Sequence, residues 1–140
     1  MNPRFVKLLV ILLLIIPLSS CKKDKQTPVI PYVYVNFQLY PNNLDYIPVS
    51  GSVYVTGGYR GLIVYRMNTD EFMAYERCCP YDPDKECARV QVEKSGITAV
   101  DSCCGSRFIL TDGSPIQGPS GYSLQQYRTS YDGNQLRIFN

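Results

Sequence analysis

Cysteine is the residue type in this chain that can do the most chemistry. The 140 residues contain six cysteines: Cys21, the adjacent pairs Cys78-Cys79 and Cys103-Cys104, and Cys87 between the pairs. Thiols can form disulfides, and thiolates bind soft metals such as Cu(I) and Zn²⁺. The chain contains no histidine. This excludes Ser-His and Cys-His catalytic pairs, zinc or haem held by histidine, and a histidine pH switch.

The start of the chain has the pattern of a secretory signal. Residues 8–16 form an apolar run after a basic start, and the run is much shorter than the ~20 residues that a membrane span needs. The sequence Leu18-Ser19-Ser20-Cys21 resembles the lipobox of bacterial lipoproteins, in which the cysteine is acylated. The resemblance implies a signal peptide over residues 1–20 and a lipid anchor on Cys21. A short membrane-anchor helix is the alternative interpretation.

A polar tether is predicted over residues 21–31, the segment that begins with the lipidated cysteine. Its three lysines favour anionic lipid headgroups. Residues 28–140 carry nine Lys and Arg against eleven Asp and Glu, so nucleic acid is not an expected partner. We expect the protein to be attached to a bacterial membrane through the lipid on Cys21. We also expect a protein or redox partner on the periplasmic or cell-surface side of that membrane.

Export sets the redox conditions of the remaining cysteines. Outside the cytoplasm, cysteines tend to pair as disulfides. Without Cys21 the chain retains five cysteines, and five is an odd number. At least one of them must therefore stay free, bind a metal or pair with another molecule.

Alternating apolar and polar residues predict an all-β domain over residues 32–140. The class is a small antiparallel sandwich or barrel, because short runs of period two are separated by Gly, Asn and Asp turns. Two cysteine-bearing loops, residues 77–87 and 102–107, interrupt this pattern. The expected strands cover residues 32–39, 52–55, 62–67, 72–76, 88–93, 97–100, 108–111, 125–131 and 135–139.

These loops resemble those of Rieske [2Fe–2S] domains, in which Cys-x-His and Cys-x-x-His-Gly-Ser loops lie between strands. The first loop here reads Cys79-Pro80-Tyr81, and residues 101–108 read Asp-Ser-Cys-Cys-Gly-Ser-Arg-Phe. A Gly turn at Gly113, the Gly118-Pro119 loop and a closing hairpin follow, as they do in that family. The resemblance covers residues 60–140 and implies a Rieske-like fold.

The four cluster-ligand positions carry other residues than in the family. Rieske centres use two cysteines on one iron and two histidines on the other. The resemblance places Cys79, Tyr81, Asp101 and Cys104 at these positions. Tyr81 and Cys104 stand where histidines belong, and Asp101 stands where the second cysteine belongs. An ordinary Rieske centre is therefore excluded.

The resemblance also implies a disulfide between the loops. Some Rieske proteins have such a bond, and its positions here are Cys87 and Cys103. In the chain-entropy model, a disulfide that closes a loop of this length stabilises the folded state by about 3 kcal/mol. Cys79 and Cys104 would then face each other across the cluster position and could bond, leaving Cys78 free. A Cys78–Cys104 bond is the alternative.

These features predict an exported lipoprotein whose degenerate Rieske-like domain is a disulfide-stapled binding or accessory module without a resident cofactor. The alternative is a [2Fe–2S] electron-transfer protein with non-histidine ligands, either at the four positions above or as four thiolates that include Cys87 and Cys103. A third hypothesis is thiol chemistry or soft-metal capture at the two adjacent cysteine pairs. No catalytic residues are expected, and the carboxylates of Asp82, Asp84 and Glu86 are interpreted as a solvated loop face.

Overall fold

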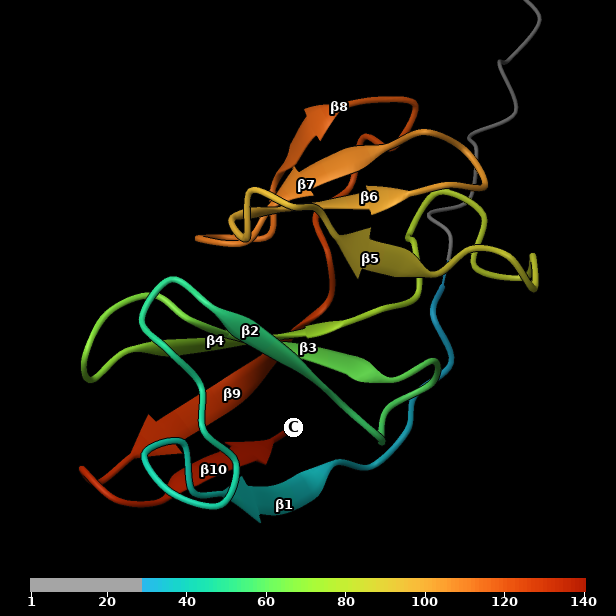
Figure 1. The fold of residues 1–140 in the computed structure, drawn as a ribbon. Coiled ribbons are helices and arrows are strands. Elements are labelled where there is room, and N and C mark those ends of the chain that lie inside the picture. The colour runs from blue at the N-terminus through green and yellow to red at the C-terminus, as the bar shows by residue number, and fades with distance from the viewer. Residues whose placement is uncertain (1–28) are drawn as a thin grey trace, which may run out of the picture.

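The computed structural model describes residues 29–140, which form ten strands (Figure 1). The predicted signal peptide, the lipid site at Cys21 and most of the tether lie outside these residues. Among the described residues no helix is long and apolar enough to cross a membrane. The strands are β1 (Asn36–Leu39), β2 (Ser52–Val55), β3 (Leu62–Arg66), β4 (Phe72–Glu76), β5 (Val90–Val92), β6 (Thr98–Asp101), β7 (Arg107–Ile109), β8 (Pro115–Gln117), β9 (Gln126–Tyr131) and β10 (Leu136–Phe139).

The strands form two antiparallel sheets. The larger sheet has the order β1-β10-β9-β4-β3-β2 and curls into a half-barrel, and the smaller has the order β5-β6-β7-β8. Figure 1 shows the small sheet above β3 and β4, on the side away from β1 and β10. The predicted all-β class is confirmed.

Strands β3 and β4 are covered on both faces. Side chains alternate across a strand, so Leu62 and Val64 join the core enclosed by the half-barrel, whereas Ile63 and Tyr65 join a second core. The second core lies between the two sheets and includes Phe108 of β7. All five residues of β3 are buried, which explains why its sequence reads as a continuous apolar run.

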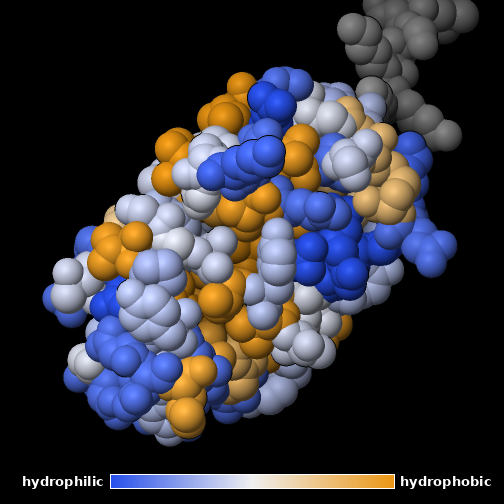
Figure 2. Space-filling model, viewed as in Figure 1, coloured by the Kyte–Doolittle hydropathy of each residue, from blue (hydrophilic) through white to orange (hydrophobic). Residues whose placement is uncertain are grey.

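The half-barrel is open along one side. Strands β1 and β2 are the two edges of the large sheet and do not pair with each other. Figure 2 shows apolar side chains along a band through the middle of the molecule, with hydrophilic side chains on both sides. Phe37, Val53 and Val55 pack against the enclosed core and are only partly buried.

One strand was not predicted from the sequence. The nine expected strands are present, seven of them with shifted ends, and the tenth, β8, pairs with β7 at the edge of the small sheet. Its first residue is Pro115, which has no N–H to donate to a neighbouring strand. Proline tends to mark a loop, but at the first position of an edge strand it is tolerated.

The carboxylate of Glu76, the last residue of β4, is fully buried. It accepts hydrogen bonds from the backbone N–H groups of Tyr59 at 2.7 Å, Arg60 at 2.8 Å and Cys78 at 3.1 Å. The Tyr127 hydroxyl of β9 donates a fourth bond at 2.8 Å. One carboxylate thus joins the β2–β3 turn, the start of the first cysteine loop and β9.

The β2–β3 turn approaches this carboxylate through a glycine. Gly58 has a φ of 61°, a value that most side chains disfavour. A Cβ at this position would collide with the Glu76 carboxylate and with the Tyr127 hydroxyl. Glycine at position 58 therefore lets the turn close onto Glu76.

We predict that Glu76→Ala lowers the free energy of unfolding by about 2–4 kcal/mol, because it leaves several buried donors without an acceptor. Urea unfolding followed by circular dichroism measures the change. Glu71→Ala is the matched control, since within residues 29–140 the Glu71 side chain bonds only to the exposed Asn68 amide, and it should stay within about 0.5 kcal/mol of wild type. Equal stabilities for the two variants would contradict the anchoring role of Glu76.

Candidate functional site

The first cysteine loop, residues 77–87, is held at its base and at its far end. At the base, Cys78 forms an antiparallel bridge with Arg89, and the Cys79 N–H donates to the Ala88 carbonyl at 3.1 Å. At the far end, the guanidinium of Arg60 donates to the carbonyls of Glu86 at 2.7 Å and Pro83 at 3.0 Å. Arg60 therefore connects the β2–β3 turn to the loop.

The second cysteine loop is a tight turn that begins at Asp101, the last residue of β6. The Asp101 backbone bonds to Ser106 and Gly105, with N···O distances of 2.9 and 2.7 Å. Its carboxylate accepts a bond from the Cys103 N–H at 2.9 Å. Asp101 is 1% exposed, so the carboxylate is buried inside the turn that it closes.

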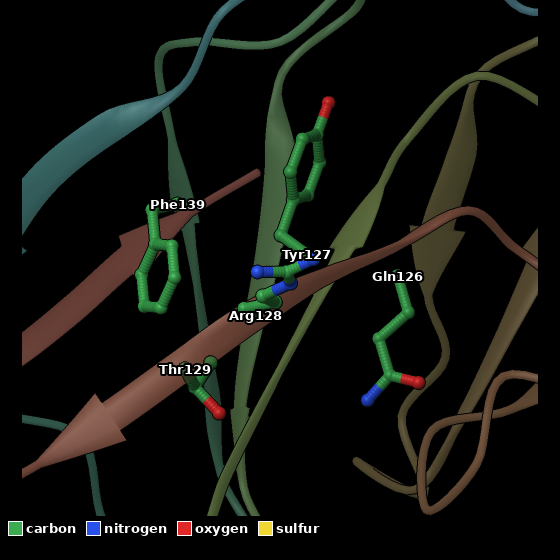
Figure 3. Close-up of a pocket in the computed structure, with 5 residues that line it drawn as sticks. All are labelled: Gln126, Tyr127, Arg128, Thr129 and Phe139. Atoms are coloured by element: carbon green, nitrogen blue, oxygen red, sulfur yellow. The ribbon is translucent and has the colours of Figure 1, made fainter.

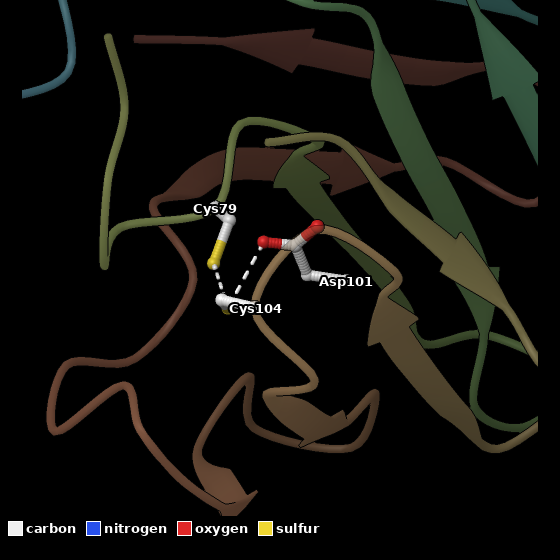
Figure 4. Close-up of side chains that lie close together, drawn as sticks. All are labelled: Cys79, Asp101 and Cys104. Atoms are coloured by element: carbon white, nitrogen blue, oxygen red, sulfur yellow. Dashed lines mark hydrogen bonds between the residues drawn. The ribbon is translucent and has the colours of Figure 1, made fainter. Parts of the chain in front are cut away.

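The two loops bring three potential metal ligands together. The Sγ atoms of Cys79 and Cys104 lie 3.8 Å apart, and the Cys104 thiol donates to Asp101 Oδ2 at 3.1 Å. One donor atom from each of these residues lies within 4.8 Å of the others. Figure 4 shows the three side chains pointing toward one another, Cys79 from the first loop and Asp101 and Cys104 from the second. Cys79 and Asp101 are buried, whereas Cys104 is partly exposed.

A disulfide joins the two loops beside this cluster. Cys87 and Cys103 form it, with Cα atoms 5.5 Å apart, and this is the pair that the family resemblance implies. Both sulfurs are thereby removed from any set of metal ligands. While this disulfide is intact, the four-thiolate ligand set that includes Cys87 and Cys103 and the chelating pair Cys103-Cys104 are not available to a metal.

Cys78 points away from the cluster. Its sulfur lies 3.7 Å from the Pro83 carbonyl, whereas Cys79 beside it faces Cys104, because adjacent residues of an extended chain point to opposite sides. Burial raises the pKa of the Cys78 thiol to about 11, and burial also raises the pKa of the Cys79 thiol. The structure contains neither a Cys79–Cys104 nor a Cys78–Cys104 bond, and these three cysteines are free thiols among residues 29–140.

Tyr81 and the acidic residues of the first loop face solvent. The Tyr81 side chain is 40% exposed. Its backbone N–H is directed at the Cys79 sulfur. Asp82 pairs with Lys85 at 2.7 Å on the surface, and Asp84 and Glu86 are exposed.

Two residues at the site were not identified from the sequence. Arg60 lies in a glycine-rich turn, and its role in holding the first cysteine loop becomes visible only from its contacts in the structure. Ser106 is fully buried, and its Oγ accepts from the Ser120 N–H at 2.9 Å and lies 3.1 Å from the Cys104 sulfur. The Gly105-Ser106 dipeptide, which matches the Gly-Ser of the Rieske loop, could have identified Ser106 from the sequence.

A [2Fe–2S] cluster does not fit these donors. A Rieske centre is held by two cysteines and two histidines, whereas the donors that meet here are two thiols and one carboxylate, all within 4.8 Å of one another. The fourth ligand position carries the exposed Tyr81. The arrangement suits one metal ion or a dithiol rather than a two-iron core.

A depression on the large sheet lies apart from the predicted site residues. It has a volume of about 440 Å³ and is lined by Gln126, Tyr127, Arg128, Thr129 and Phe139 of β9 and β10 (Figure 3). None of these residues carries a metal-binding or nucleophilic group suited to the chemistry of the cysteine loops. We therefore assign the candidate site to the loops.

Comparison with known proteins relates the fold to Rieske proteins. No family model matches the sequence, and no curated protein does. Among solved structures, the plasma membrane Rieske protein PetC3 from Synechocystis PCC 6803 is 23% identical with a TM-score of 0.56, and the match covers 74% of this chain and 97% of that one.

Two further structures come from carbazole 1,9a-dioxygenase. A chain in the complex of reduced oxygenase and oxidized ferredoxin is 16% identical with a TM-score of 0.55, over 75% of this chain and 93% of that one. The ferredoxin from Nocardioides aromaticivorans IC177 is 15% identical with a TM-score of 0.50, over 76% and 97%. At these identities the likeness concerns the fold, and residues 29–140 have a Rieske-like fold.

Proposed function

We propose that this protein is an exported, membrane-anchored lipoprotein whose Rieske-like domain is a disulfide-stapled accessory or binding module. In this proposal the domain carries no [2Fe–2S] centre. The observation that carries the proposal is the crowding of Cys79, Asp101 and Cys104, whose donor atoms lie within 4.8 Å of one another. Two thiols and one carboxylate so close together suit one metal ion or a dithiol, and they are not the two-cysteine, two-histidine set of a Rieske centre.

The disulfide supports the proposal because it replaces one structural role of a cluster. A cluster joins the two loops of a Rieske domain by covalent bonds from both. Here the Cys87–Cys103 bond joins the same two loops, and Arg60 fixes the first loop through two carbonyls. The loops are therefore held without a metal.

A protein partner is the favoured binding target. A structurally similar chain occurs in a complex of an oxygenase with its ferredoxin, which supports a protein as the binding target. Anchoring through Cys21 would place the domain beside a bacterial membrane, on the periplasmic or cell-surface side, where partners in or on that membrane are concentrated.

The absence of a cluster is tested by metal and sulfide analysis. The full-length protein, purified in detergent without oxygen from cells that assemble iron–sulfur clusters, should be colourless and lack acid-labile sulfide. Cys79→Ser should have the same visible spectrum as wild type. Near-stoichiometric iron and sulfide, with a charge-transfer band that Cys79→Ser removes, would overturn the proposal in favour of electron transfer.

The staple is tested by thermal unfolding. Cys87→Ser should lower the melting temperature by about 10 °C under oxidising conditions, since a disulfide across a loop of this length contributes about 3 kcal/mol. Reductant should lower the melting temperature of wild type by a similar amount and leave Cys87→Ser unaffected. An unchanged melting temperature in the variant would show that the bond adds no stability.

The anchor is tested by fatty-acid labelling in a bacterial host. Wild type and the Cys78→Ser control should incorporate a labelled fatty acid and remain with the membrane fraction. Cys21→Ser should lose the label, because no other cysteine stands at the end of the signal sequence. Equal labelling of the Cys21→Ser variant would rule out acylation at this position.

A further inference from the structure

We propose that Cys79, Asp101 and Cys104 form a mononuclear Zn²⁺ site in place of the two-iron cluster. This inference rests on the proposed function in one respect, the absence of a [2Fe–2S] centre. In place of a cluster with two irons, it assigns to these residues a single zinc ion with one open coordination position.

The distance between the two sulfurs matches a single zinc ion. Zinc prefers tetrahedral coordination with Zn–S bonds of about 2.3 Å, which places two thiolates of one ion about 3.8 Å apart. The Sγ atoms of Cys79 and Cys104 are 3.8 Å apart. Both thiolates can therefore bind one ion without moving relative to each other.

The third donor selects zinc among the thiophilic metals. Soft thiolates alone suit Cu(I), but zinc also accepts a carboxylate oxygen at about 2.0–2.2 Å. Asp101 Oδ2 lies 3.1 Å from the Cys104 sulfur, and all three donor atoms lie within 4.8 Å of one another. Small side-chain rotations would bring the carboxylate into the coordination shell.

The surroundings suit a bound ion. Cys79 and Asp101 are buried, and the partly exposed Cys104 provides the side from which an ion can enter. The Ser106 hydroxyl, whose oxygen already accepts from the Ser120 N–H, lies 3.1 Å from the Cys104 sulfur and can donate its hydrogen to a thiolate there. Such outer bonds orient metal ligands.

Binding is a ligand exchange with no redox step. Zn²⁺ loses bound waters and gains bonds to two sulfurs and one carboxylate oxygen, and both thiol protons pass to solvent. Three protein donors leave the fourth tetrahedral position open, an arrangement typical of zinc sites that bind water or an added ligand. A donor group from a partner protein could occupy that position.

The test is a metal titration of the full-length protein, purified in detergent without oxygen. Co²⁺ is the spectroscopic probe, and Zn²⁺ is the competitor. We expect a single equivalent of Co²⁺ to give thiolate-to-cobalt absorption and visible bands of tetrahedral cobalt, both removed by a single equivalent of Zn²⁺. Zinc X-ray absorption of the wild-type protein should show two sulfur ligands at about 2.3 Å.

Variants assign the ligands. Cys79→Ser and Cys104→Ser should each lose the two-sulfur signature, whereas Asp101→Asn should keep the sulfur absorption at lower affinity. Cys78→Ser is the matched control, because this neighbouring thiol is equally buried but faces the Pro83 carbonyl, and it should bind as wild type does. Equal zinc affinity of Asp101→Asn and wild type would remove Asp101 from the site.

Three results would overturn the zinc site even if a variant fails to fold. These are wild-type protein that retains no zinc, zinc bound without sulfur ligands, and isolated protein in which a Cys79–Cys104 disulfide has already formed. Iron with acid-labile sulfide would instead refute the proposed function itself. A colourless protein that binds no zinc would refute only this inference.

Discussion

The buried carboxylate of Glu76 is the interaction on which the geometry of the site depends. A buried carboxylate is stable only when its oxygens accept hydrogen bonds, and the four donors come from three parts of the chain: the β2–β3 turn, the start of the first cysteine loop and β9. The bond to the Cys78 N–H fixes the backbone immediately before Cys79. The carboxylate thereby sets the direction in which Cys79 faces the second loop.

The arrangement of the two loops rests on contacts that need no two-iron cluster. The Cys87–Cys103 bond crosses between them, and Arg60 and Asp101 close each loop onto backbone groups. Because these contacts do not involve a metal, the residues at the ligand positions can differ without loss of the loops. The three donors that face one another then suit a single ion, since their separation is set by the loops rather than by a cluster.

The sequence predicted the class of fold and the two loops, but not how the side chains meet. Alternation located the strands, and only β8 escaped because Pro115 indicates a loop. The resemblance to Rieske domains named Cys79, Asp101 and Cys104, yet only the contacts between the two loops in the structure show that their donors are close enough for one ion. Glu76 and Arg60 could not be recognised, since a charged residue near a turn normally faces water. The burial of Glu76 and the loop contacts of Arg60 depend on segments distant in the sequence.

The double-sided burial of β3 and β4 makes the two sheets one cooperative unit. The core between the two sheets includes side chains from the large sheet, namely Ile63, Tyr65 and Tyr75. Loss of the small sheet alone would expose these side chains to water while the half-barrel remained folded. Partial opening is therefore costly, and the amide hydrogens of both sheets should exchange with solvent mainly through global unfolding, even near the surface loops.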